Sequence, residues 1–235
     1  MIDQSQRVAA RVYAVTYLLT LAILMVTFTR FFAPYLVWNN GAATAGNLFA
    51  HEAGFRVYQT AAYLNGVGLV VLLVALYVIL RPINRGMALF AAISQLIYVG
   101  TWYAEILLGM LALRSMGSGQ HLGTIGLSSP QALSGLFLDS GWDAYYIGLP
   151  FLGLGTALFA WLFFRSRYVP RWLALWGVLA AAFEGICGFC YLLFPGFGAV
   201  VSPNWYEMPV MLFGVGLCLW LLIKGLSPRG LKAAA

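Results

Sequence analysis

The chain has 235 residues, of which 62% are hydrophobic and only 9% are charged, and its mean hydropathy is +0.86. Soluble domains carry about 25% charged residues, so this composition excludes an ordinary soluble domain and indicates a membrane-embedded protein. The net charge of +6 does not predict a nucleic-acid partner, because the basic residues are confined almost entirely to the connections on one side of the predicted membrane topology.

Six apolar segments are each long enough to cross a bilayer, which takes about 20 helical residues. The predicted spans cover residues 9–32, 58–80, 86–113, 142–164, 172–194 and 206–223. The first is too long for a signal peptide and lacks a nearby cleavage motif of small residues, so we expect it to remain as a span. The fold class that we predict is an all-α bundle of six transmembrane helices, forming one integral-membrane domain over residues 1–235.

The distribution of charge predicts the orientation of this bundle. One side of the six-span topology carries most of the basic residues, namely Arg7, Arg11, Arg81, Arg85, Arg165, Arg167, Arg171, Lys224, Arg229 and Lys232. The other side carries only Arg30, Arg56 and Arg114. Cytoplasmic loops are enriched in Lys and Arg, so we predict that both termini are cytoplasmic. Membrane lipids are the expected partners of the basic residues.

The connections on the two sides differ in length. Residues 81–86 and 164–172 are short and carry Pro and Arg, as is typical of tight turns between antiparallel helices. The outer connections, residues 33–57 and 114–141, are longer, and we expect a short helix in one or both. Ser129 before Pro130 is a pattern typical of a helix start.

A weak internal repeat relates two parts of the chain. The segment "GFRVY" at 54–58 resembles "GWDAY" at 141–145, and "NRGMALF" at 84–90 resembles "PRWLALW" at 170–176. Either spans two and three are duplicated as spans four and five, or the match is a chance one in an apolar sequence. A true repeat predicts an ion pair between Arg56 and Asp143 at the outer helix ends, and a contact between Tyr98 and Glu184.

Two segments carry a resemblance to a known family: "LRPINRGMALF" at 80–90 and "AYYIGLPFLGLGTALFAWLFFRSRYVPRWLALWGVL" at 144–179. The chain resembles the bacterial multi-span membrane proteins of domain-of-unknown-function family 4386. The opening "RVAARVYAVTYLL", the segment "AATAGNLFAHEAGFRV" and the ending "LWLLIKG" are similar too, so the resemblance covers nearly the whole chain. It implies a six-helix protein of the bacterial inner (cytoplasmic) membrane, and it implies no reaction.

Glu184 is an ionisable residue inside the fifth predicted span. At about 100° per residue, the small residues Gly177, Ala180, Ala181 and Gly188 lie within about 60° of it on the helix. Small residues let membrane helices approach closely, so we predict that Glu184 faces protein rather than lipid. A carboxylate at that depth is costly unless it is protonated, paired or hydrated.

A second polar stripe follows the third span and includes Glu105. Polar residues of other spans could join the two glutamates in an interior that opens outward. The candidate residues of this polar interior are Glu105, Glu184, Tyr98, Thr101, Ser94, Gln95, Tyr17, Thr20, Gln59 and Tyr63. Two interpretations stay open: these side chains join helices by hydrogen bonds, or the glutamates bind a proton or cation within a cavity.

The cysteines and histidines do not predict a cofactor or a metal site. Cys187 and Cys190 lie near the end of a helix, whereas a redox Cys-x-x-Cys pair usually lies at a helix N-terminus. A structural zinc ion needs about four ligands, and both histidines fall in outer loops. The remaining metal-site alternative gathers these outer residues: His51, Glu52, His121, Asp139 and Asp143. No hydrolase, zinc-protease or phosphate-loop motif is present in the sequence.

Three classes of function fit these features. The first is a non-enzymatic membrane protein that binds a lipid or small ligand, or an accessory subunit that contacts other membrane subunits or itself. The second is a small transporter coupled to protons or cations through Glu105 and Glu184. The third is an intramembrane lipid-modifying enzyme that uses these carboxylates as general acid or base. We expect the first class; enzymatic activity stays open, and the catalytic residues of an enzyme are unknown.

Overall fold

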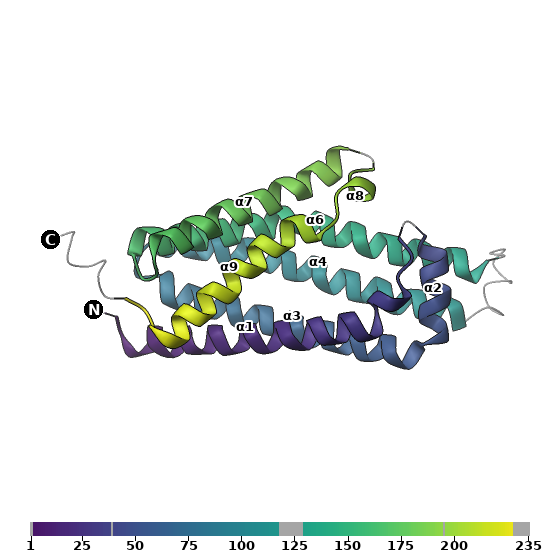
Figure 1. Cartoon of the computed structure of the whole chain (residues 1–235), viewed down its shortest axis with the longest axis horizontal. Coiled ribbons are helices and arrows are strands. Elements are labelled where there is room, and N and C mark those ends of the chain that lie inside the picture. Colours follow the sequence, from purple (N-terminus) through teal and green to yellow (C-terminus); the bar gives the residue numbers. More distant parts are fainter. Residues whose placement is uncertain (1, 39, 118–128, 195, 228–235) are drawn as a thin grey trace. The chain divides into compact units, whose positions relative to one another are not determined.

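The structure is a computed structural model that describes residues 2–38, 40–117, 129–194 and 196–227, and the described residues form helices, turns and bends without strands. Figure 1 shows the helices, which are α1 (Gln4–Phe31), η1 (Ala33–Tyr35), α2 (Gly41–Ala50), α3 (Glu52–Leu80), α4 (Arg85–Gly117), α6 (Pro130–Ser166), α7 (Arg171–Leu193), α8 (Phe197–Val200) and α9 (Asn204–Ile223). Six of them are long and apolar enough to cross a membrane. The predicted fold class of six transmembrane helices is therefore confirmed.

The boundaries agree with the predicted spans at most helix ends, and the clearest difference is in the fourth span. We predicted a span over 142–164, with a helix start at Ser129 and Pro130 in the connection before it, but α6 runs without a break from Pro130 to Ser166. The expected helix start is confirmed, because the Ser129 hydroxyl accepts a hydrogen bond from the Ala132 amide at 3.2 Å. Polar residues such as Asp139 interrupt the apolar run between the cap and the span, but none of them ends the helix.

The short helix expected in the first outer connection is present as α2. Its N-cap is Asn40, whose side chain accepts a hydrogen bond from the Ala43 amide at 2.9 Å. This is the usual role of an Asn at the start of a helix, where the first amides have no partner within the helix.

The chain divides into two compact units. Unit 1 comprises residues 1–19, 67–99 and 146–235, and unit 2 comprises residues 20–66 and 100–145. Helices α7, α8 and α9 lie entirely in unit 1, whereas η1 and α2 lie in unit 2. That both units belong to one integral-membrane domain stays a prediction.

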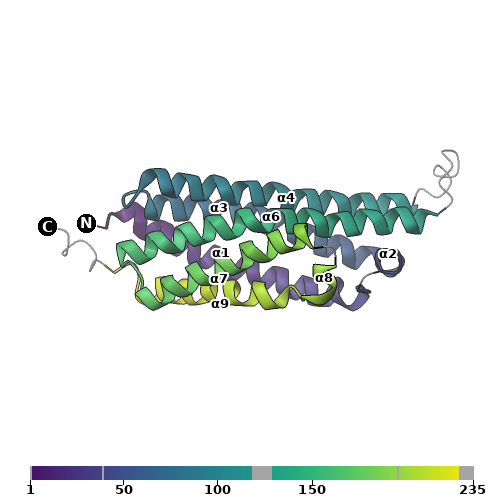
Figure 2. The same ribbon diagram turned by 90° about the horizontal axis from the view of Figure 1, so that it is seen from above.

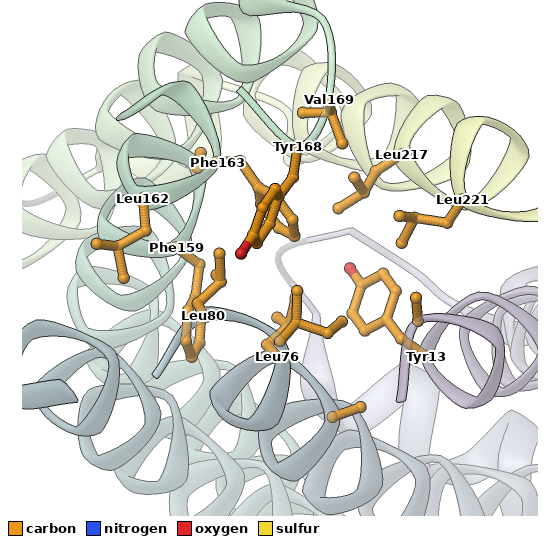
Figure 3. Packing of buried hydrophobic residues seen from close by; sticks show 14 of the residues in the cluster. Tyr13, Leu76, Leu80, Phe159, Leu162, Phe163, Tyr168, Val169, Leu217 and Leu221 are labelled. Carbon is orange, nitrogen blue, oxygen red and sulfur yellow. The ribbon is translucent and has the colours of Figure 1, made fainter. Parts of the chain in front are cut away.

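Unit 1 has a core of apolar side chains from α1, α3, α4, α6, α7 and α9. Figure 3 shows part of this core, in which side chains from several helices and from the turn after α6 point toward one another. Its labelled members are Tyr13, Leu76, Leu80, Phe159, Leu162, Phe163, Tyr168, Val169, Leu217 and Leu221. Residues from the first and the last membrane helices thus share one core.

One end of unit 1 is tied together by the buried side chain of Gln6, which is only 2% exposed. Its Nε2 donates to the Ile79 carbonyl at 2.7 Å and to the Tyr168 hydroxyl at 3.4 Å. The Ser227 amide in turn donates to the Tyr168 carbonyl at 2.9 Å. These bonds join the start of α1, the end of α3, the turn after α6 and the segment after α9.

Figures 1 and 2 show the start of α1 and the end of α9 at this same end of unit 1. We call it the basic end, because the described basic residues of unit 1 fall in or beside the helix ends that meet there: Arg7, Arg11, Arg81, Arg85, Arg165, Arg167, Arg171 and Lys224. This clustering is the arrangement that the charge distribution predicted. That the basic end faces the cytoplasm stays a prediction.

Unit 2 has an aromatic core of its own. Phe32, Phe55 and Tyr58 pack there with Leu48 of α2 and Leu113 of α4. The rings of Phe32 and Tyr58 stack with their centroids 4.9 Å apart. The short outer helix α2 is therefore part of the packed structure of unit 2, because Leu48 is buried in its core.

Candidate functional site

Glu184 lies in the middle of α7, about 20 Å along the helix from Arg171 at about 1.5 Å per residue. Its side chain is only 3% exposed. Gly177, Ala181 and Gly188 on the same face are buried as well. The prediction that Glu184 faces protein is therefore confirmed.

Glycines set the close approach of α6 to α7 beside this carboxyl group. A Cβ atom added to Gly153 of α6 would lie 2.5 Å from the Ala181 carbonyl oxygen and 2.7 Å from the Gly185 amide nitrogen. A Cβ atom on Gly188 would lie 2.6 Å from Cδ of Pro150. No larger residue fits at either position unless the helices separate. The small-residue stripe predicted around Glu184 is thus a helix–helix seam.

The carboxyl group of Glu184 is buried without a matching donor. Its Oε2 atom has no hydrogen-bond partner among the described residues. The ionisable side chain whose charge acts on it is Glu207, in the first turn of α9. Tyr17 of α1 and Cys187 of α7 also lie within range of the Glu184 charge. None of these neighbours is basic, so the site supplies no counter-ion from the described residues.

Three tyrosines, Tyr146, Tyr191 and Tyr206, form an aromatic cluster in unit 1. Tyr146 of α6 stacks on Tyr191 of α7 with ring centroids 3.6 Å apart and an angle of 5° between the rings. The ring of Tyr206, which is fully buried, lies 6.5 Å from that of Tyr146. Tyr191 is two turns beyond Glu184 on the same face of α7. The cluster therefore includes a tyrosine on the Glu184 face of α7.

Other residues of the predicted polar interior join helices within unit 1. The Ser94 hydroxyl donates to the Phe151 carbonyl at 2.9 Å, and Gln95 Nε2 donates to the Thr156 hydroxyl at 2.7 Å. Both bonds link α4 to α6, which is the structural role that we left open for these residues. Tyr98 is buried in unit 1, and its contact with Glu184 stays a prediction.

The remaining candidates of the polar interior lie in unit 2. Thr20, Thr101 and Glu105 are half-buried, and Gln59 is buried against Gly109. Tyr63 is 53% exposed, so the structure places it toward the outside of the described chain rather than in an interior. That the other candidates line one common interior with Glu184 stays a prediction.

At the outer helix ends, Arg56 forms an ion pair with Glu52 at 2.6 Å, one turn away on α3. Its predicted pairing with Asp143 stays a prediction.

No group of three or more His, Cys, Asp or Glu side chains that could hold a metal ion occurs in the described part of the chain. His121, one of the residues of the outer metal-site alternative, lies outside the described residues. Cys187, Cys190 and Cys218 are free thiols.

A groove that the sequence did not predict lies between α1 and α3 in unit 1. The groove has a volume of about 710 Å³ and is lined by Gln4, Ser5, Val8, Ala9, Val12, Val70, Val71, Val74, Ala75 and Val78. From Val70 to Val78 it follows α3 for about 12 Å, close to the depth of one leaflet, which is half of a hydrocarbon core of about 30 Å. The only sequence signal is valine at spacings of three and four residues, which also marks ordinary lipid-facing helices.

The groove ends in polar residues at the basic end. The Ser5 hydroxyl donates to Asp3 Oδ1 at 2.7 Å, and the Gln6 amide donates to the same atom at 2.8 Å. These two hydrogen bonds, together with the positive charge of Arg81, lower the pKa of Asp3 from its usual value. Arg81 comes directly after Leu80, the last residue of α3, and is exposed. Asp3 directly precedes the groove-lining residue Gln4, and Arg81 follows the groove-lining residue Val78 by three residues.

The family comparison matches residues 12–225 to the family described as "Domain of unknown function (DUF4386)". Searches among curated proteins and among solved structures gave no match. The family match covers all six predicted spans except the beginning of the first. It agrees with the resemblance seen in the sequence and, like that resemblance, adds no reaction or ligand.

Proposed function

We propose that this chain, which belongs to the DUF4386 family, is a non-enzymatic multi-pass membrane protein that binds a phospholipid. One acyl chain lies in the groove between α1 and α3, and the headgroup lies at the basic end. The observation that carries the proposal is the groove itself, with valine walls along about one leaflet depth. Asp3 and Arg81 lie close in sequence to its last lining residues, and the charge of Arg81 acts on Asp3. The basic end faces the cytoplasm of a bacterial inner membrane in this proposal.

The walls of the groove fit a hydrocarbon chain. Val8, Val12 and Val74 are 54%, 40% and 58% exposed, so their methyl groups are not covered by other side chains of the protein. Valine side chains are stiff because they are branched at Cβ. They therefore keep the groove open at little entropic cost, and a lipid tail gains dispersion contacts on two helices rather than one.

The charges at the basic end fit a phospholipid headgroup. Guanidinium groups bind phosphate oxygens in a planar, two-pronged geometry, and Arg81 follows the groove-lining residue Val78 by three residues at the basic end. The nearby carboxylate of Asp3 favours a headgroup that also carries an ammonium group. The surrounding basic residues of unit 1 add a general attraction for the phosphate-rich surface of the membrane.

The proposal is tested by measuring the phospholipid that stays bound when the protein is released gently from its membrane. Native mass spectrometry should show a wild-type chain that carries phospholipid. Val12→Trp and Val74→Trp place a large ring in the groove and should remove most of that lipid. Arg81→Gln should weaken retention with a smaller effect, because it leaves the apolar groove intact.

Val15→Trp is the matched control, because Val15 is a 47% exposed valine of α1 that does not line the groove. It should retain lipid as the wild type does. Equal retention by Val15→Trp and Val74→Trp, or a wild-type chain without lipid, would contradict the proposal. A stable complex with other membrane subunits, or with further copies of the chain, would favour the accessory-subunit role instead.

Transport coupled to protons or cations is the second candidate function. It is favoured by one observation, the buried carboxyl group of Glu184 without a basic partner among the described residues. Intramembrane ionisable residues are functional suspects because they are costly to keep. The packing around Glu184 comes from α1, α6, α7 and α9 of unit 1, so this candidate depends on residues separate from the groove lining.

A further inference from the structure

We propose that Glu184 is a reversible proton-binding site, which takes up one proton from water at the end of unit 1 opposite the basic end and releases it to the same side. The site consists of the Glu184 carboxyl group on α7, with Glu207 of α9 as the group through which the proton passes. This inference does not depend on lipid binding in the groove, because the two sites share no residue.

The burial of Glu184 makes a permanent negative charge there unfavourable. The side chain is 3% exposed, and its Oε2 atom has no hydrogen-bond donor among the described residues. An isolated ionised carboxylate loses far more free energy on leaving water than a neutral carboxyl group does. A proton removes that charge without any movement of the tightly packed helices.

The ionisable groups around Glu184 do not offer another way to neutralise it. Glu207 approaches from α9, Tyr17 from α1 and Cys187 from its own helix, and Tyr146 of α6 lies beside Glu207. Each of these groups is either acidic or neutral. The Tyr17 hydroxyl lies 3.5 Å from the Met211 carbonyl, toward which it donates. The described residues form no lysine or arginine ion pair with Glu184.

Glu207 is placed to pass the proton between water and Glu184. It lies in the first turn of α9, and the residue as a whole is half-buried. Its charge acts on Tyr146 and Tyr206 as well as on Glu184. A carboxylate that is close to both water and a buried carboxyl group can accept a proton from one and donate it to the other. No bond other than O–H forms or breaks.

The test is infrared spectroscopy of the protein in lipid vesicles, titrated from mildly acidic to mildly alkaline pH. The wild type should show the C=O band of a protonated carboxyl group that is absent from Glu184→Gln. The intensity of this band should fall as the pH rises, because the proton is lost to water. Glu207→Gln should displace the pH at which half of the band is lost. Glu52→Gln, which removes the surface ion pair with Arg56, should not.

Two results would overturn the proposal. A wild-type spectrum that matches Glu184→Gln at every pH would mean that the carboxyl group never carries the proton. A Glu184 band of constant intensity across the titration would mean a permanent structural proton without exchange. The wild-type titration and Glu207→Gln keep the proposal testable if Glu184→Gln does not fold. A displacement equal to that of Glu52→Gln would remove Glu207 from the route.

Discussion

Gln6 and Glu184 are both polar side chains buried in unit 1, at 2% and 3% exposure, but their surroundings differ. Gln6 donates from Nε2 to Ile79 and Tyr168, and its Oε1 accepts from the Asp3 amide at 3.1 Å. Glu184 has a buried oxygen without a donor among the described residues. Buried polar groups of native proteins are nearly always hydrogen-bonded, so Gln6 follows the general rule and the Oε2 atom of Glu184 departs from it.

The difference separates a structural role from a functional one. Gln6 joins segments that are far apart in the sequence, and removing its side chain would leave a buried carbonyl group without a partner. The Oε2 atom of Glu184 makes no hydrogen bond to the described residues, whereas the small residues of α7 set its close packing against α6. Three substitutions in unit 1 test this distinction, and the largest effect is expected where packing alone is changed.

Gly153→Ala should destabilise the protein most, by about 3 kcal/mol or more, because overpacking a close contact forces backbone shifts. The added methyl group would meet the Ala181 carbonyl and the Gly185 amide of α7 on both sides of Glu184. The measurement is the free energy of unfolding in mild detergent. Gly100→Ala is the matched control: Gly100 also lies inside a helix, but it has no neighbouring atom within 4 Å of the added Cβ position. It should gain up to about 1 kcal/mol from helix propensity.

If Gly153→Ala and Gly100→Ala had the same stability, close packing would not hold α6 and α7 together. The contrast between a packed Glu184 site and a hydrogen-bonded Gln6 site would then fail.

Gln6→Met should destabilise the protein by about 1–3 kcal/mol, because it leaves the buried Ile79 carbonyl unsatisfied. Methionine has a similar length and an apolar, flexible side chain. The decrease in the free energy of unfolding therefore measures the lost hydrogen bonds rather than the creation of a cavity. The same unfolding measurement applies. A stability equal to that of the wild type would show that water replaces the lost donor and that Gln6 is not a structural tie.

Glu184→Met should change stability least, by no more than about 0.5 kcal/mol, or should stabilise the protein. Replacing a buried polar group that has no partner by an apolar group of similar shape costs little. The substitution is the same in kind as Gln6→Met, so the two variants form a direct pair. A loss as large as that of Gln6→Met would mean that the Glu184 carboxyl group has a structural partner.

Much of the fold could be predicted because each membrane-spanning helix corresponds to a long run of apolar residues in the sequence. The six spans, the cap at Ser129 and the protein-facing position of Glu184 all follow from local patterns. The continuous helix from Pro130 was missed because we placed the start of the span where the long apolar run begins. Polar residues such as Asp139 interrupt the apolar run but do not end the helix. Gln6 was missed because its partners, Ile79 and Tyr168, are brought to it only by tertiary structure.

The candidate sites were predictable to different degrees. A glutamate such as Glu184 is easily recognised in an apolar helix. The small residues on the same side of the helix are enough to predict that it faces protein rather than lipid. The orphaned Oε2 atom is not predictable in this way, because it depends on what three other helices place beside it. The valine groove has no distinctive signal, since exposed valines face lipid on most membrane helices. Only the distance between α1 and α3 turns these residues into a groove.

The division of the chain into units has a consequence for the order of biosynthesis. Unit 2 has all its residues once residue 145 has been made, whereas unit 1 still lacks α7 and α9 at that stage. Gln6 then has no Tyr168 to contact, and the core of unit 1 has no Leu217 or Leu221. The nascent chain therefore holds α1 in the membrane before α7 and α9, which share its core, exist. The synthesis of α9 then completes the core of unit 1.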